Sequence, residues 1–374
     1  MITIKEAKTK KEMKQFVTFP FSLYKDNKYW VPPIIKDELD SFNPDINPVF
    51  KHAKAKFLLA YKNGKIVGRV AAIINSFEVE DQKIKKMRFG WFDMIDDIEV
   101  TKALLQEVER IGKENNLEFM EGPVGFSNLD KVGVLTKGYD HIGTMITWYN
   151  HPYYVTHLEK LGFQVAKKYL ENYFMVNELD PSSFQRAAPI LKRRFGLKEK
   201  NFTSSKEIMP YVEEMFQLFN ETYSKLSSFV PISDEQIAYF KRKFISFINP
   251  ELIKFVLDKN GKIVAFSIMM PSFSKALQKA KGKLFPFGIF HLLKAKYKND
   301  TVIAYLIGVD PAYQNKGVTA IIFDEFYKTV TKKGITKLVR TPELEENIAE
   351  AQIWKRMDNI NHKRRATYTK KIEA

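Results

Sequence analysis

A six-residue segment occurs twice in this chain, and the repeat limits the folds that the sequence can adopt. Lys-Asn-Gly-Lys-Ile-Val stands at 62–67 and again, letter for letter, at 259–264. Each copy lies between two hydrophobic runs, and Asn-Gly between such runs is a strong β-hairpin signal because both residues tolerate positive φ. Chance could produce one matching turn, but the order of elements around it is shared as well. We therefore predict two copies of one fold, at 1–178 and 179–374.

Strands and helices mix in both copies, which predicts an α/β fold on a mixed sheet. In the first copy we expect strands over 86–94, 117–120 and 171–179, and helices over 100–116 and 155–161. In the second copy we expect helices over 210–226, 234–248 and 348–357, and strands over 336–340 and 362–370.

The stretch 301–323 contains the clearest candidate for a functional site. It reads as a buried strand over 302–309, a polar loop over 313–317 and a helix that begins at Val318-Thr319. The first N–H groups of a helix have no backbone partner, and the helix dipole favours negative charge there. Gly317 would let the backbone approach a ligand closely because it has no Cβ. The stretch therefore predicts an anion-binding site.

The loop 314–319, Gln-Asn-Lys-Gly-Val-Thr, resembles the Q/R-x-x-G-x-G/A loop of the GCN5-related N-acetyltransferase (GNAT) superfamily, which holds the pyrophosphate of coenzyme A. Thr319 departs from the pattern, since Gly or Ala is usual there. In the first copy the corresponding place, 95–99, reads Ile-Asp-Asp-Ile-Glu, and carboxylates there would repel a pyrophosphate. The resemblance implies tandem GNAT-like folds, with acyl-CoA bound in the second copy and cofactor binding lost in the first.

Over nearly its whole length the chain is similar to a bacterial group of two-domain GNAT-like N-acyltransferases, in the neighbourhood of bacterial ceramide synthases. The shared segments are short. They are Trp-Val-Pro-Pro at 30–33, Gly68-Arg69, Tyr-Asn-x-Pro-Tyr-Tyr at 149–154, Leu-Glu-Glu-Asn at 344–347 and a basic strand ending in Tyr.

The resemblance also implies roles for single residues. The family holds the thioester beside a backbone N–H of the central strand, and a Tyr seven residues after an Asn protonates the leaving thiolate. Counted from Asn347, that position is Trp354, whose indole cannot donate a proton as a phenol does. Either Tyr368 or a water molecule would then protonate the thiolate, or the reaction would use no strong acid. The predicted cofactor-binding residues are Ile307, Gly308, Val309, Gln314, Asn315, Lys316, Gly317, Val318, Thr319, Asn347 and Trp354.

Two carboxylates, Glu345 and Asp310, are candidates for the base that deprotonates the amine, and with Tyr368 they make up the predicted catalytic residues. Each carboxylate has a structural alternative. Glu345 could stabilise a helix N-terminus, and Asp310 could form the turn before Pro311.

A segment at 271–300 has no counterpart in the first copy. It contains seven lysines around the apolar run Leu-Phe-Pro-Phe-Gly-Ile-Phe-His-Leu-Leu at 284–293. Such a segment is typical of a membrane interface, with lysines toward phosphates and apolar side chains toward acyl chains. A lid over an apolar tunnel, and a helix pair packed on its own domain with solvated lysines, are the alternatives.

Charge is uneven along the chain. Residues 1–180 contain 26 Lys and Arg against 25 Asp and Glu, whereas 181–374 contain 34 against 19. The basic half suits an anionic cofactor, an anionic membrane surface or nucleic acid. No aromatic-interleaved recognition motif accompanies this charge, so nucleic acid is the least favoured of these partners and a pure nucleic-acid-binding module the least favoured function. The strand Lys-Arg-Arg at 363–365 could bind phosphate, a lipid headgroup or RNA, but a solvated strand end is commoner than any of these.

Other classes of site are excluded by composition. The chain has no cysteine, so it has no disulfide, thiolate metal site or cysteine nucleophile, and the six histidines are not spaced as metal ligands. No signal-peptide core is visible, and no apolar run approaches the ~20 residues that span a bilayer. We expect a cytoplasmic protein, soluble or peripheral on the inner membrane, without a metal.

Three functions fit these features. The first is an N-acyltransferase that takes its acyl group from acyl-CoA or an acyl-carrier protein. Its acceptor would be a primary amine such as a sphinganine-like long-chain amino alcohol. The second, motivated by Trp354, is a non-catalytic acyl-CoA-binding scaffold. The third is a tandem-GNAT aminoacyl transferase that uses aminoacyl-tRNA.

Overall fold

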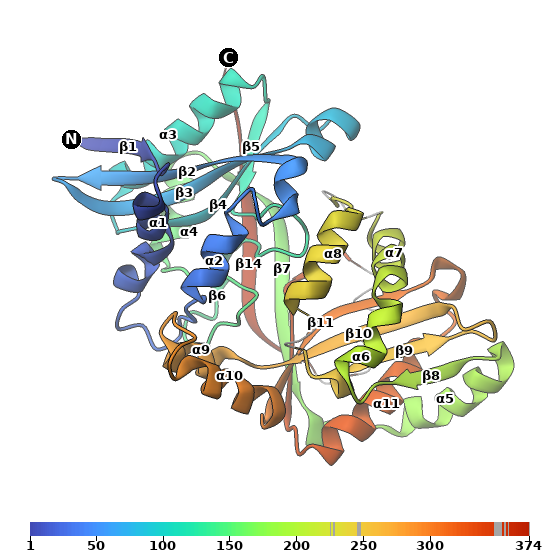
Figure 1. The fold of residues 1–374 in the computed structure, drawn as a ribbon. Helices are drawn as coiled ribbons and strands as arrows, with labels where there is room; N and C mark the ends of the chain where they lie inside the picture. The colour runs from blue at the N-terminus through green and yellow to red at the C-terminus, as the bar shows by residue number, and fades with distance from the viewer. Residues whose placement is uncertain are drawn as a thin grey trace.

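One mixed sheet runs through both halves of the molecule (Figure 1), and its strands follow the order β1-β2-β3-β4-β5-β14-β7-β12-β11-β10-β9-β8. The computed structural model describes residues 1–224, 226, 229–244, 248–347, 354, 357 and 359–373. The first-half strands are β1 (Ile2–Glu6), β2 (Ala53–Lys62), β3 (Lys65–Asn75), β4 (Lys86–Met94), β5 (Phe119–Gly122), β6 (Val134–Lys137) and β7 (Gln164–Met175). The second-half strands are β8 (Lys198–Asn201), β9 (Ile253–Leu257), β10 (Ile263–Pro271), β11 (Thr301–Val309), β12 (Lys337–Arg340), β13 (Glu343–Leu344) and β14 (Ile360–Lys371). The predicted α/β class is confirmed.

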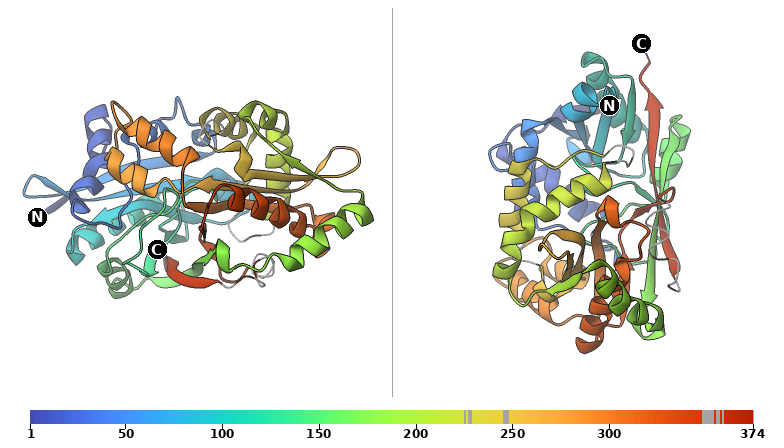
Figure 2. Two further views of the ribbon diagram at one scale, coloured as in Figure 1. Left: turned by 90° about the horizontal axis from the view of Figure 1, so that it is seen from below. Right: turned by 90° about the vertical axis from the view of Figure 1, so that its right-hand side faces the viewer.

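Helices cover the sheet on both faces (Figure 2). They are α1 (Lys10–Leu23), α2 (Ile35–Ser41), α3 (Ile98–Glu114), α4 (Tyr153–Lys160), α5 (Ser182–Phe195), α6 (Ser205–Ile208), α7 (Val212–Tyr223), α8 (Asp234–Phe244), α9 (Ser274–Ala280), α10 (Gly288–Tyr297) and α11 (Thr319–Lys332). The helix predicted over 348–357 falls almost wholly on residues outside the described ones.

Both predicted hairpins form, but their turns differ. Between β2 and β3 the two turn residues, Asn63 and Gly64, have φ of 52° and 75°. Between β9 and β10 only Gly261 has positive φ. There the Asp258 carboxylate accepts the backbone N–H groups of Asn260 (2.8 Å) and Lys262 (2.9 Å). An acidic side chain therefore closes the second turn, which the matching letters alone did not predict.

Each half contains two parallel strands joined by a crossover helix. In the first half, α3 connects β4 to β5, and residues 86–88 pair with 119–121. In the second half, α11 connects β11 to β12, and residues 301–304 pair with 337–340. The apolar faces of both helices are buried as predicted, including Leu104 and Val108 in α3 and Ile321 and Ile322 in α11. These equivalent units support the predicted duplication.

Two long strands cross between the halves. They run side by side along the molecule, as the right-hand view of Figure 2 shows. β14, from the end of the chain, pairs with β5 of the first half, while β7 pairs with β12 of the second. The sequence predicted both strands, with shifted bounds, but not these partners. The domain boundary between 178 and 179 falls just after β7 and stays a prediction.

A buried ionic cluster fastens the two crossing strands. Glu171 of β7 contacts Arg365 of β14, and its other oxygen lies 3.5 Å from the ammonium nitrogen of Lys363. Burial raises the pKa of the Glu171 carboxyl, but the two cations outweigh burial and lower that pKa overall. The prediction of a solvated strand end at 363–365 was therefore wrong for Lys363 and Arg365, which are 1% and 2% exposed.

Candidate active site

The strands β11 and β12 separate after four residue pairs. β12 pairs with β11 only as far as Ala304, and among the described residues no register continues to Val309. On the other side of β11, the pairing with β10 skips Tyr305, which forms a bulge. A cavity of about 120 Å³ lies in the resulting gap.

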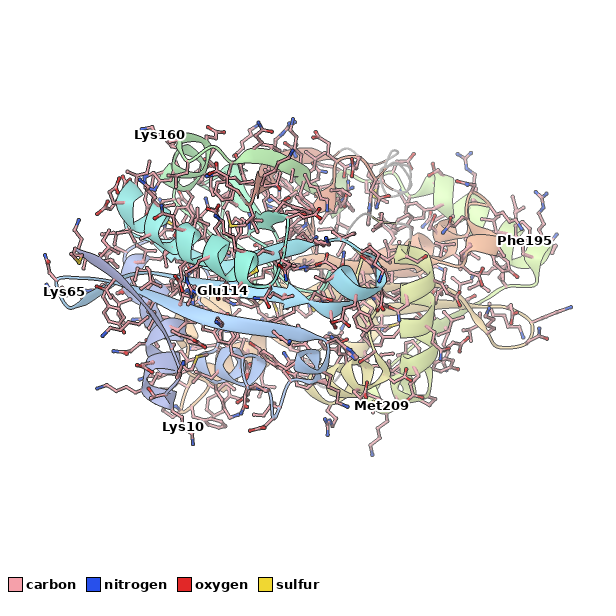
Figure 3. The ribbon with its side chains drawn as sticks, turned by 90° about the horizontal axis from the view of Figure 1, so that it is seen from above. Lys10, Lys65, Glu114, Lys160, Phe195 and Met209 are labelled. Carbon is pink, nitrogen blue, oxygen red and sulfur yellow. The ribbon has the colours of Figure 1, made fainter. Side chains whose placement is uncertain are left out.

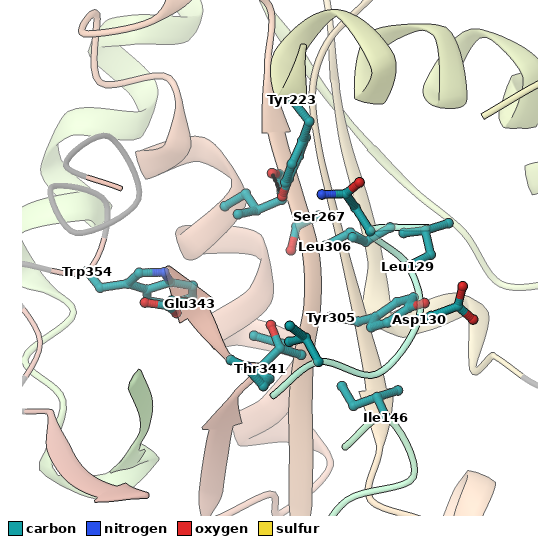
Figure 4. Close-up of a pocket in the computed structure, with 15 residues that line it drawn as sticks. Leu129, Asp130, Ile146, Tyr223, Ser267, Tyr305, Leu306, Thr341, Glu343 and Trp354 are labelled. Carbon is teal, nitrogen blue, oxygen red and sulfur yellow. Dashed lines mark hydrogen bonds between the residues drawn. The ribbon is translucent and has the colours of Figure 1, made fainter. Parts of the chain in front are cut away.

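Both halves of the molecule line this cavity (Figure 4). Trp354 and Glu343 lie on one side of it, while Leu129, Asp130 and Ile146 of the first half lie on the other. The Asn128 side-chain oxygen accepts the Val230 N–H at 3.0 Å and so ties the first-half loop to the second half. This contribution was not predicted, because a loop carries no periodic pattern that would reveal its partner.

The carbonyl groups at the end of β11 are held by side chains. The Tyr223 hydroxyl donates to the Ile307 carbonyl at 3.0 Å, and the Gln314 amide donates to the Val309 carbonyl at 3.2 Å. A Cβ at Gly308 would stand 2.4 Å from the Phe266 ring, so close packing requires glycine there. The predicted strand residues thus reach the cavity at Ile307, and Gln314 anchors the loop to the strand.

The predicted anion loop is exposed and its helix end is uncapped. Residues 314–317 are all exposed, and Gly317 has φ of 76° with no atom nearer to a built Cβ than 3.8 Å. Val318, the residue before α11, makes no side-chain cap, and the first turn contains no Asp or Glu. The strand and helix starts predicted around this loop are confirmed, and the free helix end can receive an anion.

Cations gather around the loop. The Lys316 ammonium lies 5.4 Å from the Tyr313 ring centroid and 5.6 Å from that of Phe195. The Arg194 guanidinium of α5 lies 5.3 Å from the same Phe195 ring, whereas Lys192 is paired with Glu199 at 2.8 Å. Phe195 marks this end of the molecule in Figure 3, opposite the hairpin at Lys65. The loop and the cavity both lie toward the carboxyl end of β11.

The candidate bases from the sequence are occupied or exposed. One Asp310 oxygen accepts the Ala312 N–H at 2.8 Å, and the other lies 3.4 Å from the Lys262 ammonium. This is the turn-forming role rather than that of a free base. Glu345 has 41% of its side chain exposed and lies 3.9 Å from Arg364. Neither carboxylate lines the cavity.

Tyr368 lies in the core of the first half, not beside the loop. It pairs with Gly122 across β14 and β5, and its hydroxyl donates to Glu159 at 3.4 Å. Burial raises the pKa of Tyr368 to about 12. Because β14 crosses to the first half, the structure does not bring Tyr368 together with the other predicted catalytic residues. Asn347 donates its backbone N–H to the Leu344 carbonyl at 2.9 Å.

Two side chains of the cavity stand out chemically. Trp354 is 3% exposed, packs on the Arg340 guanidinium at 4.7 Å, and has an indole N–H without a hydrogen-bond partner among the described residues. Asp130 accepts the Ser127 N–H at 2.8 Å, and burial raises the pKa of its carboxyl. Glu343 is a weaker candidate because Arg340 engages both of its oxygens.

Two phenols complete the cavity wall. Tyr223 is bonded to Ile307, whereas burial raises the pKa of the Tyr305 phenol above its usual range. In the described parts of the chain, no three His, Asp or Glu side chains are grouped as metal ligands would be. The polar groups that line the cavity thus include an indole, a carboxyl and two phenols, together with the side chains of Asn128, Ser267 and Thr341.

Comparison with known proteins gives two curated relatives and no matching family model. The chain is 31% identical to Protein YghO of Escherichia coli (strain K12) over 154 residues. These residues make up 41% of this chain and 39% of that protein. Over 169 residues it is 27% identical to the bacterial ceramide synthase of Caulobacter vibrioides, 44% of each chain. The match thus spans less than half the length of these curated relatives.

Solved structures match over the whole chain. A tandem GNAT protein from the clavulanic acid biosynthesis pathway matches with a TM-score of 0.58 and 9% identity, over 100% of this chain and 99% of that one. A GCN5-related N-acetyltransferase from Sphaerobacter thermophilus matches with a TM-score of 0.52 and 9% identity, over 100% and 96%. At such identities the likeness concerns the fold, and that fold is the tandem GNAT fold.

Proposed function

We propose that this chain, which has the tandem GNAT fold, is an N-acyltransferase that takes its acyl group from acyl-CoA and works in its second half. The observation that carries the proposal is the gap between β11 and β12. It holds a cavity with buried polar groups, and the same strand leads to a helix end without a side-chain cap, next to Lys316 and Arg194. A nucleotide end and a thioester end of one donor can bind to these two places.

The donor would be held mainly by backbone and cations. The N–H groups at the start of α11 would receive the pyrophosphate, with Lys316 and Arg194 nearby to balance its charge. In the cavity, the unpartnered indole N–H of Trp354 would donate to an oxygen of the donor. A buried N–H group without a hydrogen-bond partner costs free energy, and a hydrogen bond to a ligand oxygen would remove that cost.

The reaction needs one base and one acid. The amine nitrogen attacks the thioester carbonyl carbon, the C–N bond forms and the C–S bond breaks. Asp130 would take the proton that the amine loses, because its raised pKa makes it a stronger base than an ordinary Asp. Tyr305 is the cavity phenol whose hydroxyl is not given to Ile307, so it would protonate the leaving thiolate.

The acceptor proposed here is a primary amine on a long-chain amino alcohol, used at a membrane surface. Support comes from the similarity to the bacterial ceramide synthase of C. vibrioides, by the name that protein carries. An acyl-carrier protein could present the same phosphopantetheine thioester. It would lack the nucleotide that the α11 loop is proposed to bind.

A thiol-release assay tests the proposal. Palmitoyl-CoA and acetyl-CoA would be offered with sphinganine or with a short soluble amine, and amide formation would be confirmed by mass. We expect turnover with palmitoyl-CoA and sphinganine that Gly317→Asp lowers by about 100-fold, because the new carboxylate repels the pyrophosphate.

The matched control is Gly162→Asp. Gly162 also has positive φ, 81°, and no atom within 4 Å of a built Cβ, but it lies in the first half. It should keep wild-type turnover. Equal loss in both variants, or no turnover with any pair, would contradict the proposal. Turnover with soluble amines but not with sphinganine would contradict only the choice of acceptor.

Trp354 favours a second candidate, an acyl-CoA-binding protein without catalysis, since it replaces the phenol that GNAT enzymes use. Binding of palmitoyl-CoA without thiol release for any amine would indicate this function. The presence of Tyr305 and Asp130 in the cavity favours the enzyme.

A further inference from the structure

The turn before α10 and the outer face of α10 expose a concentrated apolar surface. Phe285, Phe287 and Phe290 are 75%, 71% and 66% exposed, and Leu293 and Tyr297 are 47% and 66% exposed. These are five of the twelve large hydrophobic side chains exposed in the described residues. A cluster of this kind on a folded surface marks an interaction site.

Helix α10 presents apolar side chains outward. Phe290, Leu293 and Tyr297 recur at intervals of three and four residues, so they share one face. The inner face consists of Gly288 and Leu292, which are buried. If the helix pair were packed on its own domain with only lysines in solvent, the larger apolar set, Phe290, Leu293 and Tyr297, would be buried. These side chains are exposed, so that alternative does not describe α10.

The segment is fixed to the body of the protein by α9 and the turn after it. Ser274 donates to the Gly143 carbonyl at 2.8 Å, and Gln278 donates to the Trp30 carbonyl at 2.9 Å. The Ile35 N–H donates to the Gly282 carbonyl at 2.9 Å. All three partners belong to the first half, and α9 lies beside it in Figures 1 and 2. These hydrogen bonds thus anchor the segment that carries the apolar face to the first half.

Positive charge surrounds this face. The segment 271–299 contains seven lysines and no Asp or Glu. Within the described residues no carboxylate pairs with six of them, namely Lys275, Lys279, Lys281, Lys283, Lys294 and Lys298. Behind α10 an open groove of about 890 Å³ is lined by four of these lysines and by Lys333 and Lys337 of the second half. Lysines therefore outnumber the one carboxylate, Asp300, in the lining of the groove beside the apolar surface.

We propose that this docking face, Phe285, Phe287, Phe290, Leu293 and Tyr297 with the surrounding lysines, binds the surface of an anionic lipid bilayer. The aromatic rings would enter the boundary between headgroups and acyl chains, and the lysines would contact lipid phosphates. An acidic protein would complement the lysines but not five apolar side chains among them. In the described residues no helix is long and apolar enough to cross a membrane.

This inference goes beyond the proposed reaction and does not need it. Vesicle flotation of the full chain tests it directly, without acyl-CoA. Wild type should float with phosphatidylglycerol vesicles and bind phosphatidylcholine vesicles about tenfold more weakly, with the difference shrinking as salt rises. Phe285→Ser/Phe287→Ser/Phe290→Ser should lose at least about tenfold in binding, and Lys281→Glu/Lys283→Glu should lose only the preference for anionic lipid.

The control is Ile190→Ser/Met209→Ser, which removes exposed apolar side chains, 64% and 36% exposed, outside the docking face. It should bind as wild type does, and equal thermal midpoints would show that all variants are folded. The proposal is overturned if wild type floats with neither vesicle, or if the triple variant binds like wild type. The proposal is also overturned if the triple substitution converts a dimer into a monomer without changing vesicle binding. The same holds if an acyl-carrier protein binds the docking face and vesicles do not.

Discussion

The starts of α3 and α11 occupy the same place in the two halves, yet they are chemically opposite. At α3, Asp97 accepts the Glu99 N–H at 3.0 Å, and its other oxygen lies 2.7 Å from Lys62. Glu99 adds a second carboxylate to the first turn. At α11 no side chain caps the helix, no acid is present and Lys316 lies beside it. One end carries the protein's own carboxylates, and the other has neither a side-chain cap nor an acid in its first turn.

The strands that lead to these helices differ in what lies beside their ends, although side chains hold carbonyl groups at both. At the end of β4, the Tyr153 hydroxyl donates to the Met94 carbonyl at 2.6 Å, and the Met94 N–H donates to Tyr154 at 3.3 Å. Those side chains come from α4 of the same half. At the end of β11 a cavity remains, lined by a loop from the other half. Both halves thus share the parallel-strand and crossover-helix unit, and the cavity described above lies beside the second-half strand.

The largest expected effect concerns the base. Asp130→Asn keeps the shape and one acceptor oxygen but cannot take a proton, so kcat should fall about 100-fold. Because the pKa of Asp130 is raised, wild-type kcat/KM should fall on acidification. The fall should begin at a higher pH than it would for a base with the ordinary pKa of Asp. A variant that retains half of wild-type kcat would show that the first-half loop only shapes the cavity.

Moving a carboxylate from the start of α3 to the start of α11 tests whether charge at the helix end decides which half binds coenzyme A. Thr319→Asp places in α11 the carboxylate that α3 carries, and palmitoyl-CoA should bind about tenfold more weakly because the charges repel. The reciprocal variant Asp97→Ala/Glu99→Gln should gain no coenzyme A binding, since the end of β4 stays bonded to Tyr153 and Tyr154. Binding in that variant, measured by calorimetry, would mean that the acids alone silenced the first copy.

Removal of the free indole donor should have a moderate effect. Trp354→Phe keeps an aromatic ring against Arg340 but removes the N–H, so KM for acyl-CoA should rise about fivefold, the value of one hydrogen bond. Steady-state kinetics would measure it. An unchanged KM would show that the indole N–H does not contact the donor.

The smallest effect is on stability. The raised pKa of Asp130 means that folding disfavours its ionised form, so this carboxyl costs stability once pH exceeds its unfolded pKa. Asp130→Asn should therefore raise the thermal midpoint near neutral pH by a few degrees, and the gain should vanish in acid. A lower midpoint at neutral pH would show that the carboxylate is stabilising.

Local elements were predictable, and long-range pairing was not. β4, α3, β11 and α11 follow from apolar periodicity, and Gly317 marks the loop between the last two. β14 reads as the same basic strand wherever it pairs, so its move to the first half, which carries Tyr368 away from the loop, has no local signature. Lys363 looks solvated because its counter-charge, Glu171, lies 192 residues earlier. Asp130 sits in a loop whose destination is set only by tertiary contacts such as Asn128 with Val230.

The most direct test of a single working site is the stoichiometry of coenzyme A binding by calorimetry. We expect one molecule per chain, with binding lost in Gly317→Asp and unchanged in Gly162→Asp and in Asp97→Ala/Glu99→Gln. Two molecules per chain, or one that survives Gly317→Asp, would contradict the assignment of the site to the second half.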